Sequence, residues 1–190
     1  MWAVIGLGNP GRRYSATRHN AGFVFIHRLA RRWGTRLGKK KFSARIADVK
    51  KNEQRLILAQ PQTYMNLSGS AVKQIMDGYR IGPENIIIVY DDLDIPLGQI
   101  RVRKSGSGGT HKGLRSVIAA TGTTAFLRLR VGIGPLPAGE DATGYVLAPF
   151  TAGERPLLES GLAGAEEALD FVLDGRVDAA MNKFNKKSMM

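Results

Sequence analysis

The sequence predicts one layered α/β domain, and three observations support this prediction. Segments with strand and helix patterns alternate along the chain, which is typical of α/β layers. The 190 residues are 43% apolar, enough for a core that buries roughly 70% of the unfolded surface. No internal repeat, low-complexity tract or long Pro/Ser linker divides the chain. We therefore expect a single domain over residues 1–190.

The first elements follow from apolar spacing. The apolar run from Trp2 to Leu7 predicts a buried strand, and the stripe within Ala21–Trp33 predicts an amphipathic helix. Ser43–Val49 and Arg55–Ala59 predict two strands around a polar turn at residues 51–53. After a loop, a helix is expected from about Ser68, which is a natural N-cap.

The second half continues the alternation. Ile86–Tyr90 is continuously apolar, as in a strand buried on both faces of a central sheet. Gln99–Lys104 and Arg128–Ile133 alternate basic with apolar residues and predict further strands, separated by a Gly/Ser segment and a short helix near Gly113–Ala120. The last third is expected to be helical. Thr151 and Glu154 have capping-box spacing there, although Pro156 does not suit a helix that starts at Thr151.

Charge is distributed unevenly around a net value of +12. Residues 1–60 hold 14 Lys/Arg against two acids, residues 95–139 hold seven basic residues and no acid, and residues 140–178 hold nine acids. Clustered positive charge indicates a polyanion as partner, and a merely basic surface is the alternative. Charge alone does not distinguish RNA from DNA or from an acidic membrane.

Composition excludes several classes of protein. The absence of cysteine excludes disulfides, thiol catalysis and Cys-based metal sites, and it fits a reducing compartment. Three histidines are too few for most histidine-built metal sites. The longest apolar stretches are too short to span a bilayer, and the N-terminus lacks the features of a secretory signal in order. We expect a cytoplasmic protein with no membrane partner.

Residues 6–11 match G-x-G-x-x-G after a strand but do not predict a dinucleotide site. Pro10 and the residues after it do not open a helix, and no acid stands between Gly11 and Asp48 to bind a ribose. The glycines instead allow unusual dihedrals or a close ligand approach. Asn9 then presents an amide at the carboxyl end of the strand, where open α/β sheets place their sites.

A histidine and a group of acids are the candidates for catalysis. His19 lies in a polar run at a helix start, where it is accessible enough to act as a base; a structural or surface role is the alternative. Asp91 emerges after the buried strand and is able to accept from an imidazole N–H. Asp92 and Asp94 add charge, but the spacing of the acids resembles no metal site. The alternative, considered for Asp94, is a turn in which an Asp side chain binds backbone N–H groups.

Two further histidines and an amide have less defined roles. His27 lies on the helix flank and is expected at the edge of the core, whereas His111 sits in the glycine-rich segment and is placed to orient backbone or touch ligand. Asn66 offers an uncharged amide in a loop before a helix, where it either binds a ligand or acts as a cap.

Taken together, these segments resemble the bacterial-type peptidyl-tRNA hydrolase family from Val4 to about Asn185. Six motifs occur in the family's order and spacing: G-L-G-N-P-G, T-R-H-N-A-G-F, Q-T-Y-M-N-L-S-G, Y-D-D-L-D-I-P-L-G, G-G-T-H-K-G-L and R-L-R-V-G-I-G. The resemblance implies a twisted mixed sheet surrounded by helices. It implies hydrolysis, without metal or cofactor, of the ester that joins a peptide to the terminal ribose of tRNA.

The resemblance also implies roles for individual residues. His19 matches the catalytic base, and Asp91 the acid that pairs with it. Asn9 and Asn66 match amides that hold the substrate and polarise or position the reacting group, and Asn9 is counted with the catalytic residues. Tyr14, Tyr64 and Lys112 are expected to contact substrate, and Arg103 and Arg130 to grip tRNA phosphate. The chain departs from the family where Lys112 stands in place of a third amide and Thr110 replaces a glycine. A lysine keeps a hydrogen-bond donor but no acceptor.

The chemistry of the residues agrees with hydrolysis. Without a cysteine or a nucleophile elbow, attack by water on an ester is the simplest route, and a histidine base contributes about 10²–10⁴-fold. A monomer is expected, because the acidic C-terminal part has no obvious apolar surplus. The alternatives are a catalytically inactive RNA-binding relative, as in plant organelle splicing factors that resemble this family, and a dinucleotide-dependent enzyme.

Overall fold

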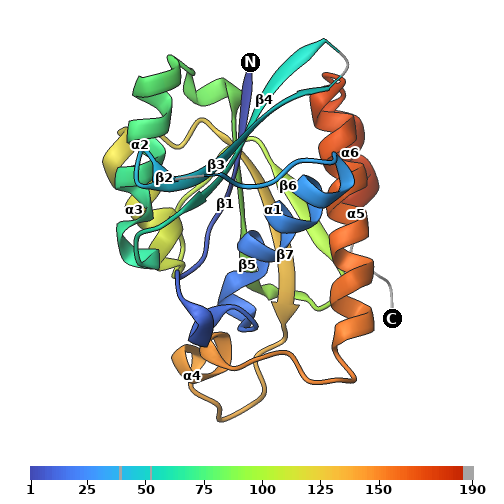
Figure 1. The fold of residues 1–190 in the computed structure, drawn as a ribbon. Helices are drawn as coiled ribbons and strands as arrows, with labels where there is room; N and C mark the ends of the chain where they lie inside the picture. The colour runs from blue at the N-terminus through green and yellow to red at the C-terminus, as the bar shows by residue number, and fades with distance from the viewer. Residues whose placement is uncertain (39, 52, 186–190) are drawn as a thin grey trace.

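The computed structural model describes residues 1–38, 40–51 and 53–185, and these form one seven-stranded mixed sheet with helices on both faces (Figure 1). The strand order is β2-β3-β4-β1-β5-β7-β6. The strands are β1 (Trp2–Gly6), β2 (Lys40–Lys41), β3 (Ala44–Lys51), β4 (Gln54–Pro61), β5 (Ile86–Pro96), β6 (Ile100–Arg103) and β7 (Leu127–Gly134). The predicted α/β class and mixed sheet are confirmed.

The four central strands run parallel, and the outer strands are antiparallel. β1 pairs in parallel with β4 and with β5, and β5 pairs in parallel with β7. β3 and β6 run antiparallel to β4 and β7, and β2 to β3. The carboxyl ends of β4, β1, β5 and β7 therefore meet at one edge of the sheet, so polar residues that follow these strands gather there.

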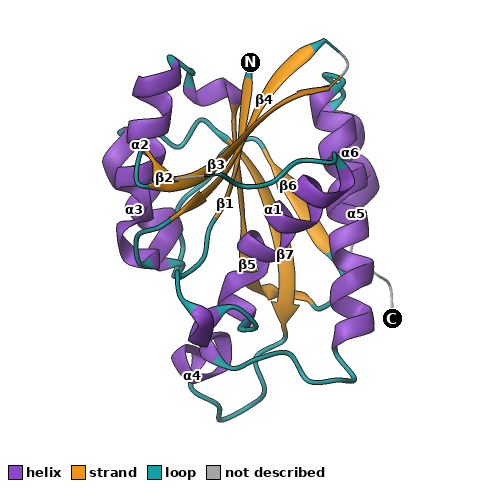
Figure 2. Cartoon of the chain, viewed as in Figure 1, coloured by secondary structure: helices purple, strands orange, loops and turns teal. Residues whose placement is uncertain are grey.

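Side-chain alternation along the strands divides the core into two layers. Val4, Ile87 and Val89 face a cluster with the helices α1 (Ala21–Arg32), α5 (Arg155–Leu173) and α6 (Val177–Phe184). Ile5, Ile88 and Tyr90 face the opposite cluster with α2 (Ser68–Tyr79) and α3 (Lys112–Thr121). Figure 2 shows these two helical layers on either side of the strands. The predicted amphipathic helix at residues 21–33 is confirmed, because its apolar stripe lies in the first cluster.

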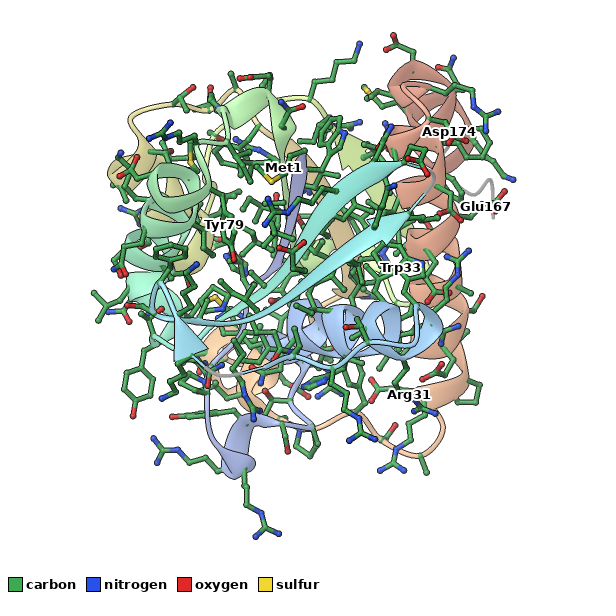
Figure 3. All side chains as sticks on the ribbon, turned by 45° about the horizontal axis from the view of Figure 1, so that its top comes forward. Met1, Arg31, Trp33, Tyr79, Glu167 and Asp174 are labelled. Atoms are coloured by element: carbon green, nitrogen blue, oxygen red, sulfur yellow. The ribbon has the colours of Figure 1, made fainter. Side chains whose placement is uncertain are left out.

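Basic residues of the N-terminal part pair with the acids of the C-terminal part. Arg32 of α1 donates to Asp170 of α5 over 2.9 Å, and Arg28 and Lys51 pair with Glu159 and Asp170. Figure 3 shows Arg31 and Trp33 at the end of α1, Glu167 on α5, and Asp174 at the end of α5. Part of the clustered positive charge therefore holds the α1 layer together and is not free for a polyanion.

Several elements differ from the sequence-based prediction. β5 runs on to Pro96, so the acids lie within a strand, with a register shift between Asp92 and Pro96. Ser68 is not a cap: Leu67 is the N-cap of α2, and the buried Ser68 hydroxyl has no hydrogen-bond partner among the described residues. A helix α4 (Ala142–Leu147), capped by the Asp141 side chain, was not predicted, because six residues show no apolar period.

The capping-box prediction is resolved by the structure. Thr151 N–H donates to Glu154 Oε2 over 2.7 Å, and Glu154 N–H donates to Thr151 Oγ1 over 3.3 Å. The helix itself begins only at Arg155, so Pro156 falls in the first turn, where no backbone N–H is needed. The predicted turn at residues 51–53 contains Asn52, which lies outside the described residues. Among the residues that are described, no helix is both long and apolar enough to cross a membrane.

Candidate active site

A large open pocket lies at the carboxyl ends of the parallel strands. Its volume is about 1500 Å³. The lining comes from the segments after β1 and β4, from the second half of β5, from the glycine-rich segment before α3, and from β7 and α4. Most of the predicted site residues are brought together there: Asn9, His19, Tyr64, Asn66, Asp91, Arg103, Lys112 and Arg130. Segments more than 100 residues apart in sequence thus form one concave site, as expected for a sheet of this class.

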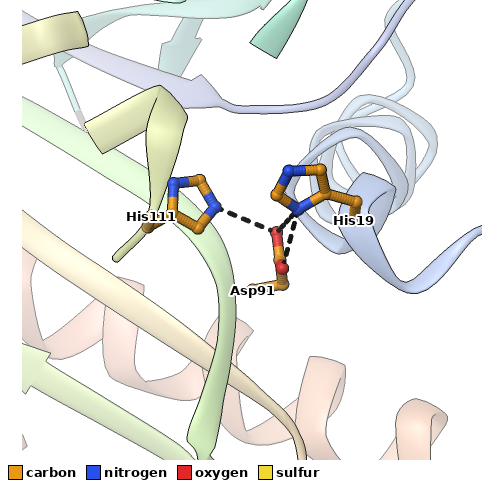
Figure 4. A group of neighbouring side chains, drawn as sticks. All are labelled: His19, Asp91 and His111. Carbon is orange, nitrogen blue, oxygen red and sulfur yellow. Dashed lines mark hydrogen bonds and ion pairs between the residues drawn. The ribbon is translucent and has the colours of Figure 1, made fainter. Parts of the chain in front are cut away.

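His19 and Asp91 are hydrogen-bonded at the floor of this pocket. His19 Nδ1 lies 3.0 Å from Asp91 Oδ1 and 2.9 Å from Oδ2 (Figure 4). The Asp91 side chain is 2% exposed and the His19 ring 13%. A carboxylate offers only acceptors, so Nδ1 carries the proton and donates it. The Nε2 lone pair of His19 is therefore left to accept a proton in the pocket.

His111 is a second imidazole on the same carboxylate, a contact that the sequence did not predict. Leu114 N–H donates to His111 Nδ1 over 3.1 Å, which makes His111 the N-cap of α3. Nδ1 is thus an acceptor, and the ring proton stands on Nε2, which donates to Asp91 Oδ1 over 3.2 Å. The two rings lie 5.1 Å apart between centroids. The cap therefore fixes the tautomer of His111 and its direction toward Asp91.

These two imidazoles determine the charge of Asp91. Burial by itself raises the pKa of a carboxyl group, but the electrostatic interaction and hydrogen bonds with His19 and His111 outweigh it and hold the pKa of Asp91 well below its usual range. Asp91 is thus an ionised acceptor at neutral pH. An ionised carboxylate on Nδ1 also stabilises the imidazolium that forms when Nε2 takes a proton.

Glycines bring His19 to this position. A Cβ on Gly6 would lie 2.1 Å from the Gly22 carbonyl oxygen, and a Cβ on Gly22 would lie 2.4 Å from the Val89 carbonyl oxygen. The start of α1 therefore packs directly on the ends of β1 and β5. His19 stands in the 3-10 turn Arg18–Asn20 just before that helix. Gly6 thus serves helix packing, not the close ligand approach that the glycine pattern suggested.

Asn9 is held rigidly, with its amide nitrogen left as a donor. Met65 N–H donates to Asn9 Oδ1 over 2.8 Å. The backbone of Asn9 exchanges two hydrogen bonds with the Asn20 side chain, of 2.8 and 3.0 Å. Because Oδ1 is occupied by Met65, the side-chain NH₂ of Asn9 remains available at the pocket wall. Asn20, which joins Asn9 to the turn of His19, was missed because its role depends on residues 11 positions apart.

The predicted substrate contacts divide into two groups. Tyr64, Asn66 and Lys112 are exposed at the pocket, and Asn66 lies in a 3-10 turn, not at a helix cap. Tyr14 is not among the residues that line the pocket, and its ring stacks against the Arg13 guanidinium at 4.5 Å. His27 is exposed on α1, not at the core edge as predicted. The His27 ring is still partly desolvated, and this, together with the neighbouring Arg45 cation, lowers the pKa of His27.

Four arginines share one face of the strands β6 and β7. Arg101 lies opposite Arg130, and Arg103 lies opposite Arg128 in the antiparallel ladder. Directly opposite residues project to the same side of a sheet, and like charges there oppose folding. Arg130 is paired with Asp92 through its Nε at 2.6 Å, so only part of its guanidinium is free. Such a face favours an anionic ligand.

Arg128 was not predicted as a site residue and holds the glycine-rich segment. It is 3% exposed. Its guanidinium donates to the Ser107 carbonyl over 2.6 Å and also to the Gly106 carbonyl. Desolvation lowers the pKa of Arg128, and the neighbouring Arg130 cation acts in the same direction. The cation thus keeps the segment over the pocket.

The group of His19, Asp91 and His111 also has the composition of a metal site. Their ligand atoms lie within 4.8 Å of one another, and two histidines with one carboxylate are a known ligand set. However, the proton on His111 Nε2 is fixed by the Leu114 cap and points at Asp91, as does the Nδ1 proton of His19. The ring protons of His19 and His111 thus occupy all three contacts between the imidazoles and the Asp91 carboxylate. The turn role considered for Asp94 belongs to Asp92 instead, because Asp92 Oδ1 accepts from Asp94 N–H.

The geometry defines a hydrolase-type site, with a histidine base oriented by a buried carboxylate at the strand ends of an α/β sheet. The sequence model of a family described as peptidyl-tRNA hydrolase matches residues 3–190, and the chain belongs to this family. A peptidyl-tRNA hydrolase of Alkaliphilus metalliredigens is 44% identical over 97% of this chain and 100% of its own length. One of Chloroflexus aurantiacus is 45% identical over 97% and 99%.

Comparison with solved structures supports the same family. A crystal structure of peptidyl-tRNA hydrolase in complex with N-propanol has a TM-score of 0.92 and 36% identity, and the match covers 100% of this chain and 97% of that chain. A crystal structure of the Acinetobacter baumannii peptidyl-tRNA hydrolase has a TM-score of 0.91 and 36% identity, with 97% and 94% covered. The resemblance seen in the six motifs therefore holds for the whole fold.

Proposed function

We propose that this protein hydrolyses the ester bond between peptide and tRNA in peptidyl-tRNA and releases free tRNA, with His19 as the general base. The observation that carries the proposal is the 2.9 Å contact between His19 Nδ1 and the buried Asp91 carboxylate, at the floor of a pocket with arginines on its wall. Membership of the peptidyl-tRNA hydrolase family supports the same substrate.

In the proposed reaction, His19 Nε2 takes a proton from water as the water oxygen attacks the ester carbonyl carbon. Asp91 stabilises the imidazolium that results, because it already accepts the Nδ1 proton. The tetrahedral intermediate then collapses with cleavage of the bond to the ribose oxygen, and the imidazolium returns its proton to that leaving oxygen. The products are the peptide carboxylic acid and free tRNA, and the base is regenerated.

Asn9 is the proposed donor to the oxygen that gains negative charge. Its NH₂ group is directed by the bond from Met65 N–H to Oδ1, so little reorganisation is needed during the reaction. A fixed donor of this kind contributes about 10²–10³-fold. An ester is an activated bond, and a base and one donor therefore suffice for the chemistry.

Arg103 and Arg130 are the proposed contacts to tRNA phosphate. Both line the pocket wall, and phosphate contacts position a nucleic acid without reading its sequence, as an enzyme that serves many tRNAs requires. Tyr64, Asn66 and Lys112 are the proposed contacts to the substrate beside the ester, since they are exposed around the pocket. Tyr14 is not proposed, because it is absent from the pocket lining.

Peptidyl-tRNA is a product of translation, so we propose that the protein works in the cytoplasm, as a monomer and without an obligate protein partner. The inactive RNA-binding relative has no support, because His19, Asp91, Asn9 and Asn66 are all retained around one pocket. RNA binding with a steep salt dependence but without ester cleavage would favour that alternative. A dinucleotide enzyme would require NAD(P) binding in a titration.

The deciding experiment measures release of free tRNA from N-blocked aminoacyl-tRNA. His19→Ala is expected to lose at least about 10²-fold in kcat. His27→Ala is the matched control, because His27 is an exposed histidine on α1 outside the pocket lining and its loss leaves the rate unchanged. A chelator is expected to have no effect. Equal rates for His19→Ala and wild type would refute His19 as the base.

A further inference from the structure

Arg18, the residue before the proposed base, makes an unusual number of buried contacts. Its side chain is 7% exposed. Nη2 donates to both carboxylate oxygens of Glu154, at 2.8 Å each. Nη1 donates to the carbonyl of Pro149 over 3.0 Å and, at longer range, to those of Ala148 and Tyr145. The guanidinium also lies 4.2 Å from the centroid of the Tyr145 ring.

These contacts join the turn of His19 to α4. Arg18 N–H donates to the Ala148 carbonyl over 3.0 Å, and Thr17 forms an isolated bridge with Pro149. The carbonyls that face Arg18 stand at the carboxyl end of α4, where a cation is favourable. Residues 146 and 147 of the same helix line the pocket. The Arg18 guanidinium thus links the 3-10 turn that carries His19 to α4, the helix that forms part of the pocket wall.

Glu154 fixes the guanidinium from the other side. Besides its two bonds to Arg18, Glu154 Oε2 accepts from Thr151 N–H, and Glu154 N–H donates to Thr151 Oγ1. Burial raises the pKa of Glu154, but the hydrogen bonds from Arg18 and Thr151 outweigh it, so that the pKa lies below its usual range. The carboxylate therefore stays charged and is itself tied to the start of α5.

We infer that Arg18 and Glu154 form a positioning pair that sets the His19 turn and α4 at a fixed distance across the active site. The inference rests on the proposed function. It adds that the positions of the base and of the pocket wall are coupled through one planar guanidinium, which binds the α4 carbonyls on one side and Glu154 on the other. A displacement of about 1 Å in a reacting group costs about 10²-fold in rate, so a loosened pair changes catalysis without any contact to substrate.

The test uses substitutions that keep the charge or the shape of each partner. In Arg18→Lys, one ammonium is able to pair with Glu154 but not also to hold the α4 carbonyls and stack on Tyr145, since it lacks the planar fork. We expect kcat to fall and KM to rise, with kcat/KM at least about tenfold lower. Glu154→Gln keeps the shape without the charge and is expected to act in the same direction.

The matched control is Arg32→Gln. Arg32 also joins the α1 region to an acid of α5, at 2.9 Å from Asp170, and it stands at the far end of α1 outside the pocket lining. This variant lowers the melting temperature but keeps kcat and KM within about twofold of wild type, because a one-sided surface pair makes little difference to geometry elsewhere. All rates are measured well below each variant's melting temperature.

A second readout does not depend on activity. The hydrogen-bonded Nδ1 proton of His19 gives a downfield resonance in proton NMR, assigned by its loss in His19→Ala. We expect it to be broadened or lost in Arg18→Lys and retained in Arg32→Gln. If Arg18→Lys keeps this resonance together with wild-type kcat and KM, the positioning pair is refuted. If wild type cleaves no ester, the proposed function falls, and the resonance alone still decides whether Arg18 positions His19.

Discussion

Replacing Asp91 by asparagine separates the charge of this residue from its shape and determines which tautomer His19 adopts. In the wild type, His19 Nδ1 donates to both oxygens, at 3.0 and 2.9 Å, and His111 Nε2 donates to Oδ1 at 3.2 Å. An amide has one oxygen and one NH₂ group, so one of these positions becomes a donor. The orientation of the new amide therefore decides the state of the base.

His111 determines that orientation. Its Nδ1 accepts from Leu114 N–H, so Nε2 keeps its proton and requires an acceptor opposite. The oxygen of the introduced amide thus takes the position of Asp91 Oδ1, and the NH₂ group takes the position of Oδ2, whose one hydrogen-bond partner in the described part of the chain is His19. His19 then adopts its other tautomer, in which Nδ1 accepts a hydrogen bond from the amide and the ring proton is on Nε2. The nitrogen that faces the pocket is then no longer a base.

The expected magnitude follows from losing both the correct tautomer and the support of the imidazolium. For a histidine base oriented by a carboxylate, this combination costs up to about 10⁴-fold in kcat, and we expect a loss of at least about 10³-fold in kcat here. KM is expected to change little, because the Asp91 side chain is only 2% exposed and offers little surface for a substrate to contact. Release of free tRNA from N-blocked aminoacyl-tRNA measures both constants.

Asp77→Asn is the control, since Asp77 is an exposed aspartate of α2 whose side chain pairs only with Lys73 in the described part of the chain. It is expected to have wild-type constants. Circular dichroism confirms that both variants are folded. A loss of less than tenfold in Asp91→Asn would show that the tautomer does not limit the reaction, and the assignment of His19 as the base would be wrong.

Four further outcomes follow from the same geometry. Asn9→Ala removes the directed NH₂ group and is expected to lower kcat by about 10²–10³-fold. Arg103→Ala is expected to weaken tRNA binding and to reduce the slope of the log binding constant against log salt concentration by about 1. Purified substrate is used to measure kcat in the first case and binding in the second. Lys112→Asn replaces a cation by a donor and acceptor at the pocket, and KM for peptidyl-tRNA with an acidic residue next to the ester is expected to rise more than KM for a neutral one. The pKa values of Asp91 and Glu154 are lower in the folded protein than in the unfolded chain. Both carboxylates therefore stabilise the fold fully above about pH 4–5 and lose this contribution as pH falls through the folded pKa values. The melting temperature is expected to fall toward pH 3, and to fall less in Asp91→Asn.

The secondary structure could largely be predicted, with exceptions that have physical reasons. Strands such as Trp2–Gly6 and helices such as Ala21–Arg32 carry apolar periods that any buried layer requires. α4 has only six residues and depends on its Asp141 cap and on Arg18, so no periodic signal marks it. Ser68 had the residue type of a cap, but the 3-10 turn before it gives that position to Leu67.

The amino-acid sequence by itself determined the layers, the chemical types in the site and the family, because periodicity and motif order are local properties. Only the tertiary structure decided the charge and proton states. Asp91 meets His19 across 72 residues and His111 across 20, and Arg18 meets Glu154 across 136. Hydrogen bonds of this kind depend on atoms within about 3 Å. Such distances arise only once the parallel strands have brought their carboxyl ends to one edge of the sheet.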